Sequence, residues 1–174
     1  GILNRREFAP DVAQMEEFNL PSIDLVIVDL YPFEETVSSG GTHEQIIEKI
    51  DIGGISLIRA AAKNFKDVVI VSSQSDYGTL LDLLKNGEGV TTREERQLLA
   101  SRAFRVSSNY DTQIHEWMIG GRSIDHLNIS EMHSDNLRYG ENPHQPGKFF
   151  GALNDLFDQL NGKALSYNNL LDID

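Results

Sequence analysis

The chain has no cysteine among its 174 residues, which excludes disulfide bonds and every site that depends on a thiolate. Long hydrophobic runs are also missing, since no stretch approaches the roughly 20 apolar residues that a membrane-spanning helix needs. No basic segment followed by an apolar one stands at the start, as it would in a secretory signal. The sequence therefore predicts a soluble globular protein without a membrane partner, and the lack of cysteine is compatible with a cytoplasmic location.

Positive charge is scarce as well. Fifteen Lys and Arg residues stand against 27 Asp and Glu residues, so the formal net charge is -12 and the pI is about 4.7. Nucleic acids and anionic membranes are bound by clustered Lys and Arg, and we expect neither partner. A small anionic ligand is compatible with this charge, because a helix N-terminus and a few local cations are enough to hold one phosphate.

The length of the chain and its hydrophobic content of 40% suffice for one core and part of a second. The chain begins with Gly1 rather than Met, so we expect a fragment or a processed chain. Residues 122–136 are polar and aperiodic, which predicts a linker. His126 and His133 in this segment lack the clustering of metal ligands, and we predict no metal site.

The segment Ile23–Phe33 has an uninterrupted β-branched and aliphatic centre, which predicts a strand covered on both faces of a parallel sheet. Pro32 ends it. Asp29 and Tyr31 then fall at the carboxyl end of the strand, the edge where open parallel sheets bind their ligands. A capping carboxylate and a half-buried aromatic ring are equally compatible with these two residues.

The stretch Ile50–Asn64 predicts a short helix that is apolar almost all round, which usually means burial. Asp51 and a pair of glycines open this helix. Two groups of residues define its sides: Ser56, Arg59 and Lys63 on one, and Ile55, Ile58, Ala62 and Phe65 on the expected core side.

Two interpretations of this helix stay open. An unpaired buried charge costs on the order of several kcal/mol, so Arg59 and Lys63 are expected to be paired or to face a polar cleft with a ligand. Alternatively, Asp51 is only an N-cap, the glycines only a turn, and Lys63 only a complement to the helix dipole.

Further elements follow from local signals. A Ser-Ser-Gly-Gly loop is predicted for 34–41, a helix for 42–49 with Ile46 and Ile47 inward, and a buried strand for 68–71, connected by right-handed parallel crossovers. Ser75 and Asp76 are expected to cap a helix that ends at Asn86-Gly87. A capping box at 92–95 predicts a long helix that stops at Gly120-Gly121, with a core stripe formed by Leu99, Ala103, Val106, Tyr110, Ile114 and Trp117.

The sequence after residue 136 has a different character. Residues 137–145 combine a cation, an aromatic ring, two amides and a histidine, and 148–150 predict a strand. Residues 160–163 predict a hairpin turn, and 164–172 predict the start of a helix.

Four segments, Val28–Phe33, Ile50–Asn64, Leu137–Gln145 and Leu165–Asp172, closely resemble the bifunctional purine-biosynthesis family that joins IMP cyclohydrolase to AICAR transformylase. The resemblance covers essentially the whole chain in order. It implies that 1–130 is the later part of a cyclohydrolase domain with a methylglyoxal-synthase-like open α/β fold. Residues 131–174 would begin a transformylase domain with a cytidine-deaminase-like fold.

The resemblance also implies a function, the last two steps of de novo purine biosynthesis. Formyl transfer from the co-substrate 10-formyltetrahydrofolate to AICAR is followed by cyclodehydration of formyl-AICAR to IMP. No cofactor is expected on the fragment itself, and a homodimer is expected for the full-length protein. Earlier phosphate-binding motifs and the later formyl-transfer residues of the family are absent, so we expect the fragment alone to be inactive.

The resemblance carries site residues over onto this sequence. Lys63, Asp51 and Tyr31 match catalytic residues of the cyclohydrolase. The nucleotide contacts that it implies are Val28, Asp29, Asp51, Ile52, Gly53 and Gly54 for the cyclohydrolase, and Arg138, Tyr139 and Asn169 for the transformylase. Many members have Asn where this chain has Asp29. The alternative from another functional class is a methylglyoxal-synthase-like regulatory module that binds nucleotides without catalysis.

Overall fold

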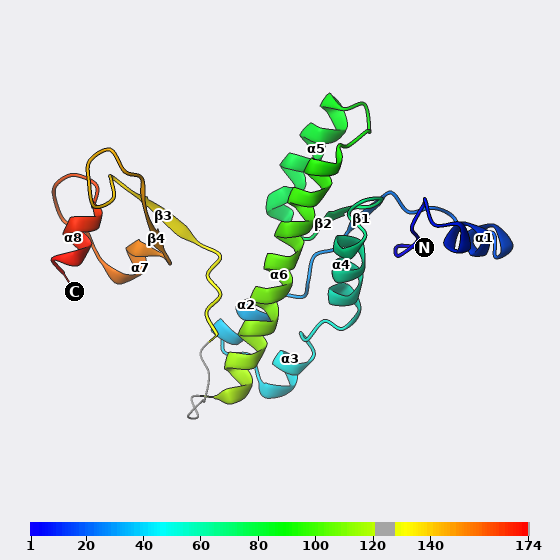
Figure 1. Ribbon diagram of the computed structural model, residues 1–174. Helices are drawn as coiled ribbons and strands as arrows, with labels where there is room; N and C mark the ends of the chain where they lie inside the picture. The colour runs from blue at the N-terminus through cyan, green and yellow to red at the C-terminus, as the bar shows by residue number, and fades with distance from the viewer. Residues whose placement is uncertain (121–127, 174) are drawn as a thin grey trace. The chain divides into compact units, whose positions relative to one another are not determined.

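The computed structural model describes residues 1–120 and 128–173. The chain divides into two compact units, Gly1–His126 and Leu127–Asp174, and each is described by itself. The fold is mixed α/β, with a small parallel sheet in the first unit and a small antiparallel sheet in the second (Figure 1). Among the described residues, no helix is both long and apolar enough to cross a membrane.

A two-stranded parallel sheet forms the centre of the first unit. Strand β1 (Leu25–Ile27) pairs with β2 (Val69–Val71), and Val26 lies opposite Ile70. The predicted parallel arrangement is confirmed. Strand β2 is buried along its whole length because its side chains alternate between two clusters. One contains Ile70 and helix α4 (Gly53–Lys63), and the other contains Val69, Val71 and helix α5 (Tyr77–Asn86).

Helix α6 (Arg93–Ile119) is the longest element and packs against both β2 and α4 (Figure 1). The predicted capping box is present, because the Thr92 hydroxyl accepts from the Glu95 N–H and the Glu95 carboxylate accepts from the Thr92 N–H. Gly120 ends the helix with a φ of 60°, a left-handed conformation that glycine adopts without strain. In the predicted stripe, Leu99, Ala103 and Tyr110 are buried, and Val106, Ile114 and Trp117 are partly buried.

The first strand is shorter than predicted, and other elements do not cover both of its faces completely. Only three residues of the Ile23–Phe33 segment are in β1, and the Ile27 side chain is 48% exposed. Within the described residues β1 pairs with β2 alone, so one of its edges has no neighbouring strand. The prediction of burial on both faces is therefore wrong for Ile27.

Residues 34–38, predicted as part of a loop, form helix α2 (Phe33–Ser38) together with Phe33, which was predicted at the end of the strand. Phe33, at its start, is 2% exposed and packs edge-to-face against Tyr110 and Trp117 of α6, with ring centroids 6.0 and 5.9 Å away. These contacts link residues 77 and 84 positions apart in the sequence, and no local pattern reports them. Tertiary packing thus orders a segment whose Ser and Gly content favours a turn.

Helix α3 (His43–Ile47) follows α2 and is capped by Thr42. Ile46 is buried as predicted, whereas Ile47 is 38% exposed, so the prediction that both point inward is wrong for Ile47. After β2, the 3-10 helix η1 (Gln74–Asp76) leads into α5. Asp76 stands at the N-cap of α5 but makes no side-chain capping bond there, whereas the Ser73 hydroxyl caps η1. Near the start of the chain, α1 (Ala9–Glu17) completes this unit.

The second unit contains an antiparallel pair, β3 (Ser134–Leu137) and β4 (Gly147–Phe150). The strand at 148–150 is confirmed, whereas 134–136, predicted as linker, belong to β3. The segment 160–163 connects helices α7 (Leu153–Leu156) and α8 (Tyr167–Leu171), so the predicted hairpin turn is wrong. His126 lies outside the described residues.

Candidate functional site

The carboxyl ends of β1 and β2 bring together polar residues from two segments. The Val28 N–H donates to the Val71 carbonyl at 3.0 Å, which extends the pairing by one step beyond β1. Asp29 follows, and its Oδ2 accepts a hydrogen bond from the Tyr77 hydroxyl at 2.5 Å. This bond raises the pKa of Tyr77, because the carboxylate favours the protonated phenol. The phenol thus stays a hydrogen-bond donor.

Tyr31 lies two residues further along the same edge and is 55% exposed. The ammonium group of Lys49 stands over its ring, 5.6 Å from the centroid. An exposed tyrosine beside a cation at the ligand-binding edge of a parallel sheet is available to contact a ligand. Sequence analysis predicted Tyr31 in this place but did not find Lys49.

Asp51 caps the N-terminal end of α4. Its Oδ1 accepts from the Gly54 N–H at 2.6 Å. A Cβ atom at Gly54 would lie 2.5 Å from the Asp51 Oδ2, so glycine is needed there for the carboxylate to approach the helix end. The arrangement is an acidic group at the positive end of a helix dipole.

The backbone before Asp51 is held by Tyr110 of α6. The Tyr110 hydroxyl donates to the Lys49 carbonyl and accepts from the Asp51 N–H at 2.8 Å. Burial raises the pKa of this phenol. Since the Tyr110 side chain is only 8% exposed, this pair of bonds attaches the Asp51 loop to the core.

The other predicted contacts of this loop differ in exposure. Ile52 is 73% exposed, and a Cβ atom at Gly53 would meet nothing within 4 Å. The turn that opens α4 is therefore accessible from solvent at both residues. Val28, by contrast, is partly buried against the cluster around Ile70 and is less accessible than Ile52.

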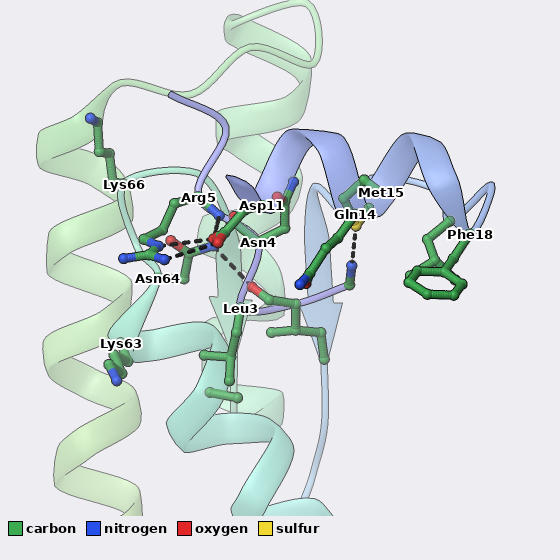
Figure 2. Close-up of a pocket in the computed structure, with 14 residues that line it drawn as sticks. Leu3, Asn4, Arg5, Asp11, Gln14, Met15, Phe18, Lys63, Asn64 and Lys66 are labelled. Carbon is green, nitrogen blue, oxygen red and sulfur yellow. Dashed lines mark hydrogen bonds and ion pairs between the residues drawn. The ribbon is translucent and has the colours of Figure 1, made fainter. Parts of the chain in front are cut away.

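Lys63 is the last residue of α4 and is exposed. It lines an open cavity of about 990 Å³ between the end of α4 and the N-terminal segment. Figure 2 shows Lys63 and Lys66 on the α4 side of this cavity, with Met15 on α1 and Phe18 at the end of α1. Nearby, the Asn64 amide donates to two backbone carbonyls of the N-terminal segment.

Asp51 stands two residues before the first residue of α4, and Lys63 is its last residue, so the two lie at opposite ends of this helix. That both belong to one cyclohydrolase site stays a prediction. Asp51 is also not among the residues that line the Lys63 cavity. Arg59 is exposed, and its guanidinium donates to the Ser107 hydroxyl at 3.2 Å and lies over Phe104.

In the second unit, the structure brings together Arg138 and Asn169. Both line a cavity of about 520 Å³, together with Lys163. The Arg138 guanidinium lies over the Tyr139 ring, 4.9 Å from the centroid, and donates to the Tyr139 hydroxyl at 3.3 Å. Tyr139 itself is not among the residues that line the cavity. A cation pair of Arg138 and Lys163 suits an anionic ligand.

Asn169 has a structural task at the same time. Its Oδ1 accepts from the N–H and the hydroxyl of Ser166, and its own N–H donates back to that hydroxyl. This capping box starts α8, and Ser166 is fully buried. Only the Nδ2 group of Asn169 is therefore left to meet a ligand.

Two tyrosines, Tyr77 and Tyr110, position candidate site residues but were not singled out from the sequence for this task. Tyr77 follows the carboxyl end of β2 by a few residues, and ligands bind at this edge of a parallel sheet, so its position in the sequence could have marked it as a candidate. Tyr110 was predicted as a core residue only. Nothing local links its hydroxyl to Asp51, which is 59 positions away.

Comparisons with known proteins find the family that the sequence motifs resemble. The sequence profile of the AICARFT/IMPCHase bienzyme family matches residues 61–174. The chain is 55% identical over 173 residues to the bifunctional purine biosynthesis protein PurH of Bacteroides thetaiotaomicron, covering 99% of this chain and 34% of that protein. For PurH of Rhodopirellula baltica, the identity is 44% over 185 residues, covering 100% and 35%. The chain thus spans about a third of the length of these relatives.

A solved structure is similar as well. The crystal structure of ForH superposes with a TM-score of 0.57 at 36% identity, covering 71% of this chain and 63% of that chain.

Proposed function

Because this chain belongs to the AICARFT/IMPCHase bienzyme family, we propose that it supplies part of both active sites of a bifunctional purine-biosynthesis enzyme. The reactions are formyl transfer from 10-formyltetrahydrofolate to AICAR and cyclodehydration of formyl-AICAR to IMP. The observation that carries the proposal is the 55% identity with a PurH protein over 173 residues. In this proposal, 1–130 belong to a methylglyoxal-synthase-like cyclohydrolase domain, and 131–174 begin a cytidine-deaminase-like transformylase domain.

Cyclisation forms a C–N bond between the carboxamide nitrogen and the formyl carbon, and the carbinolamine then loses water. The carboxamide is a poor nucleophile, so a group must take its proton, and the departing hydroxide must receive one. We assign the proton transfer to Lys63 and the orientation of the amide to the Asp51 carboxylate. Since the Gly54 N–H already occupies Oδ1 of Asp51, Oδ2 is the oxygen left to accept from the substrate.

Tyr31 and Asp29, at the carboxyl ends of the strands, complete the nucleotide contacts on this side, together with the opening turn of α4. For the transformylase, Arg138 and the Nδ2 group of Asn169 bind AICAR, and the planar guanidinium suits its phosphate. Asp51 and Lys63 lie at opposite ends of α4, so cyclisation needs parts of the protein outside this chain. We therefore expect the isolated chain to be inactive, and the homodimer of the full-length protein to be the active form.

One observation favours a second candidate, a regulatory nucleotide-binding module. Asp51 is used as a helix cap and does not meet Lys63, so the chain on its own presents a binding turn without a catalytic pair. The two candidates differ in what Lys63 does. A binding module does not need an exposed lysine for proton transfer.

The test uses a full-length PurH protein that contains this sequence. This is either the protein to which the sequence belongs or the B. thetaiotaomicron protein in which the 173 matching residues are replaced by this sequence. Lys63→Ala is expected to lower kcat for cyclisation at least 100-fold, the range of general acid–base catalysis, with the Kd for IMP changed less than about threefold. Lys66→Ala is the matched control, because Lys66 lies on the same cavity wall and pairs with Glu7. Cyclisation that survives Lys63→Ala would favour the binding module.

A further inference from the structure

The bond between Tyr77 and Asp29 joins the ends of two parallel strands. Asp29 follows β1 by two residues, and Tyr77 follows β2 by six. Their side chains meet at 2.5 Å, within the range of a charge-assisted bond from a hydroxyl to a carboxylate. The pair therefore lies on the ligand-binding edge of the sheet.

Tyr77 is held in place from the other side by a largely buried ion pair. Asp76, the residue before it, is 7% exposed and accepts from the Arg102 guanidinium of α6 at 2.6 Å. Leu80, one turn later in α5, packs into the cluster of Val69, Val71 and Leu99. The start of α5 is thus fixed to the core, although the Tyr77 ring itself is 42% exposed.

Fixing one carboxylate oxygen determines what the other can do. A carboxylate only accepts hydrogen bonds, and Oδ2 of Asp29 already accepts one from the phenol. Oδ1 is then the oxygen with more acceptor capacity for a ligand, and its direction is set by the Tyr77 bond. An asparagine in this position would be able to present either a donor or an acceptor.

We propose that Tyr77 is a positioning residue that orients Asp29, so that this pair selects a nucleotide by a hydrogen-bond donor, either a ribose hydroxyl or an N–H of the base. The inference rests on the proposed function, since it takes Asp29 as a nucleotide contact of the cyclohydrolase. It goes beyond that function by assigning a role to Tyr77 and a donor requirement to the ligand.

The experiment uses the full-length PurH protein that carries this sequence, with Tyr77→Phe, Asp29→Asn and the double variant. Tyr77→Phe is expected to raise the Kd for IMP and the KM for formyl-AICAR about tenfold, as for loss of a hydrogen bond to a charged group, with kcat changed less than about threefold. In the Asp29→Asn background the same substitution is expected to change Kd less than about threefold, because coupled residues are not additive. A purely structural role would lower thermal stability without this coupling.

Two ligand analogues distinguish the source of the donor. If a ribose hydroxyl is recognised, Tyr77→Phe no longer changes the Kd for 2′-deoxy-IMP. If a base N–H is recognised, it no longer changes the Kd for 1-methyl-IMP. Tyr167→Phe is the matched control, since Tyr167 lies in the second unit and its ring is 44% exposed.

Three results would overturn the inference. The first is a Tyr77→Phe protein whose Kd stays within twofold while Lys63→Ala still abolishes cyclisation, which leaves the proposed function intact. The second is a Kd for both analogues that Tyr77→Phe raises as much as it raises the Kd for IMP. The third is an unmodified protein that neither binds IMP nor cyclises formyl-AICAR, and this would remove the proposed function as well.

Discussion

Tyr110→Phe tests whether α6 holds the Asp51 loop. The substitution keeps the ring, and with it the edge-to-face contact with Phe33, but removes the hydroxyl that bonds to the Lys49 carbonyl and the Asp51 N–H. Each such bond contributes about 1 kcal/mol net, so the loss is expected to be about 2 kcal/mol. With a urea m-value of about 2 kcal/mol/M, the midpoint of unfolding falls by about 1 M.

The chain carries its own reporter for this measurement, since Trp117 is the single tryptophan and packs against Phe33 in the same cluster. Urea unfolding is followed by Trp117 fluorescence. Tyr31→Phe is the control, because the Tyr31 side chain is 55% exposed and its loss of a hydroxyl is expected to cost less than about 0.5 kcal/mol. Equal midpoints for the two variants would refute the argument that the Tyr110 hydroxyl holds the loop.

Two further predictions concern charge pairs in the first unit. Arg102→Met leaves the buried Asp76 carboxylate without its partner and is expected to lower the free energy of unfolding in urea by about 2–3 kcal/mol. Adding Asp76→Asn is expected to recover more than half of this loss. A double variant as unstable as the single one would contradict the prediction. The hydrogen bond from Arg5 lowers the pKa of Asp11 to about 2, so the stabilisation from this pair is complete above the ordinary value of 3.8 and is lost as pH falls through about 2. Carboxyl NMR titration checks it. Arg5→Gln should raise the pKa of Asp11 toward its ordinary value, although the backbone N–H of residue 5 still donates to the carboxylate, and an unchanged midpoint would argue against the pairing.

The elements that were predicted well are those whose signals are local. The capping box at Thr92 and the left-handed Gly120 set the ends of α6 through contacts within one turn, so the sequence alone reports them. Helix α2 was missed because its order depends on Phe33 meeting Trp117 across a long loop closure. The length of β1 was overestimated for a similar reason, since an aliphatic run does not reveal how many neighbouring strands are present.

In the candidate site, too, the residues with local sequence signals were predicted and those that depend on distant contacts were not. The position of Asp29 and Tyr31 after β1 was predictable, because the strand and its end are marked in the sequence. That Asp51 and Lys63 serve one cyclohydrolase site stays a prediction, since the two residues lie at opposite ends of the 11-residue helix α4. The partner of Asp29, Tyr77, follows a different strand and is brought to it only by the parallel pairing.

One helix, α6, connects these observations. Through Tyr110 it holds the backbone before Asp51, and through Arg102 it holds Asp76 and thereby the start of α5. Through Arg96 it binds the carbonyls of Phe65 and Lys66, directly after α4. Each bond is made on a different turn of the same helix, so the loops around Asp51, Tyr77 and Lys63 are held by a common rigid support. Their relative positions therefore depend on α6, although none of the predicted site residues of this unit lies on it.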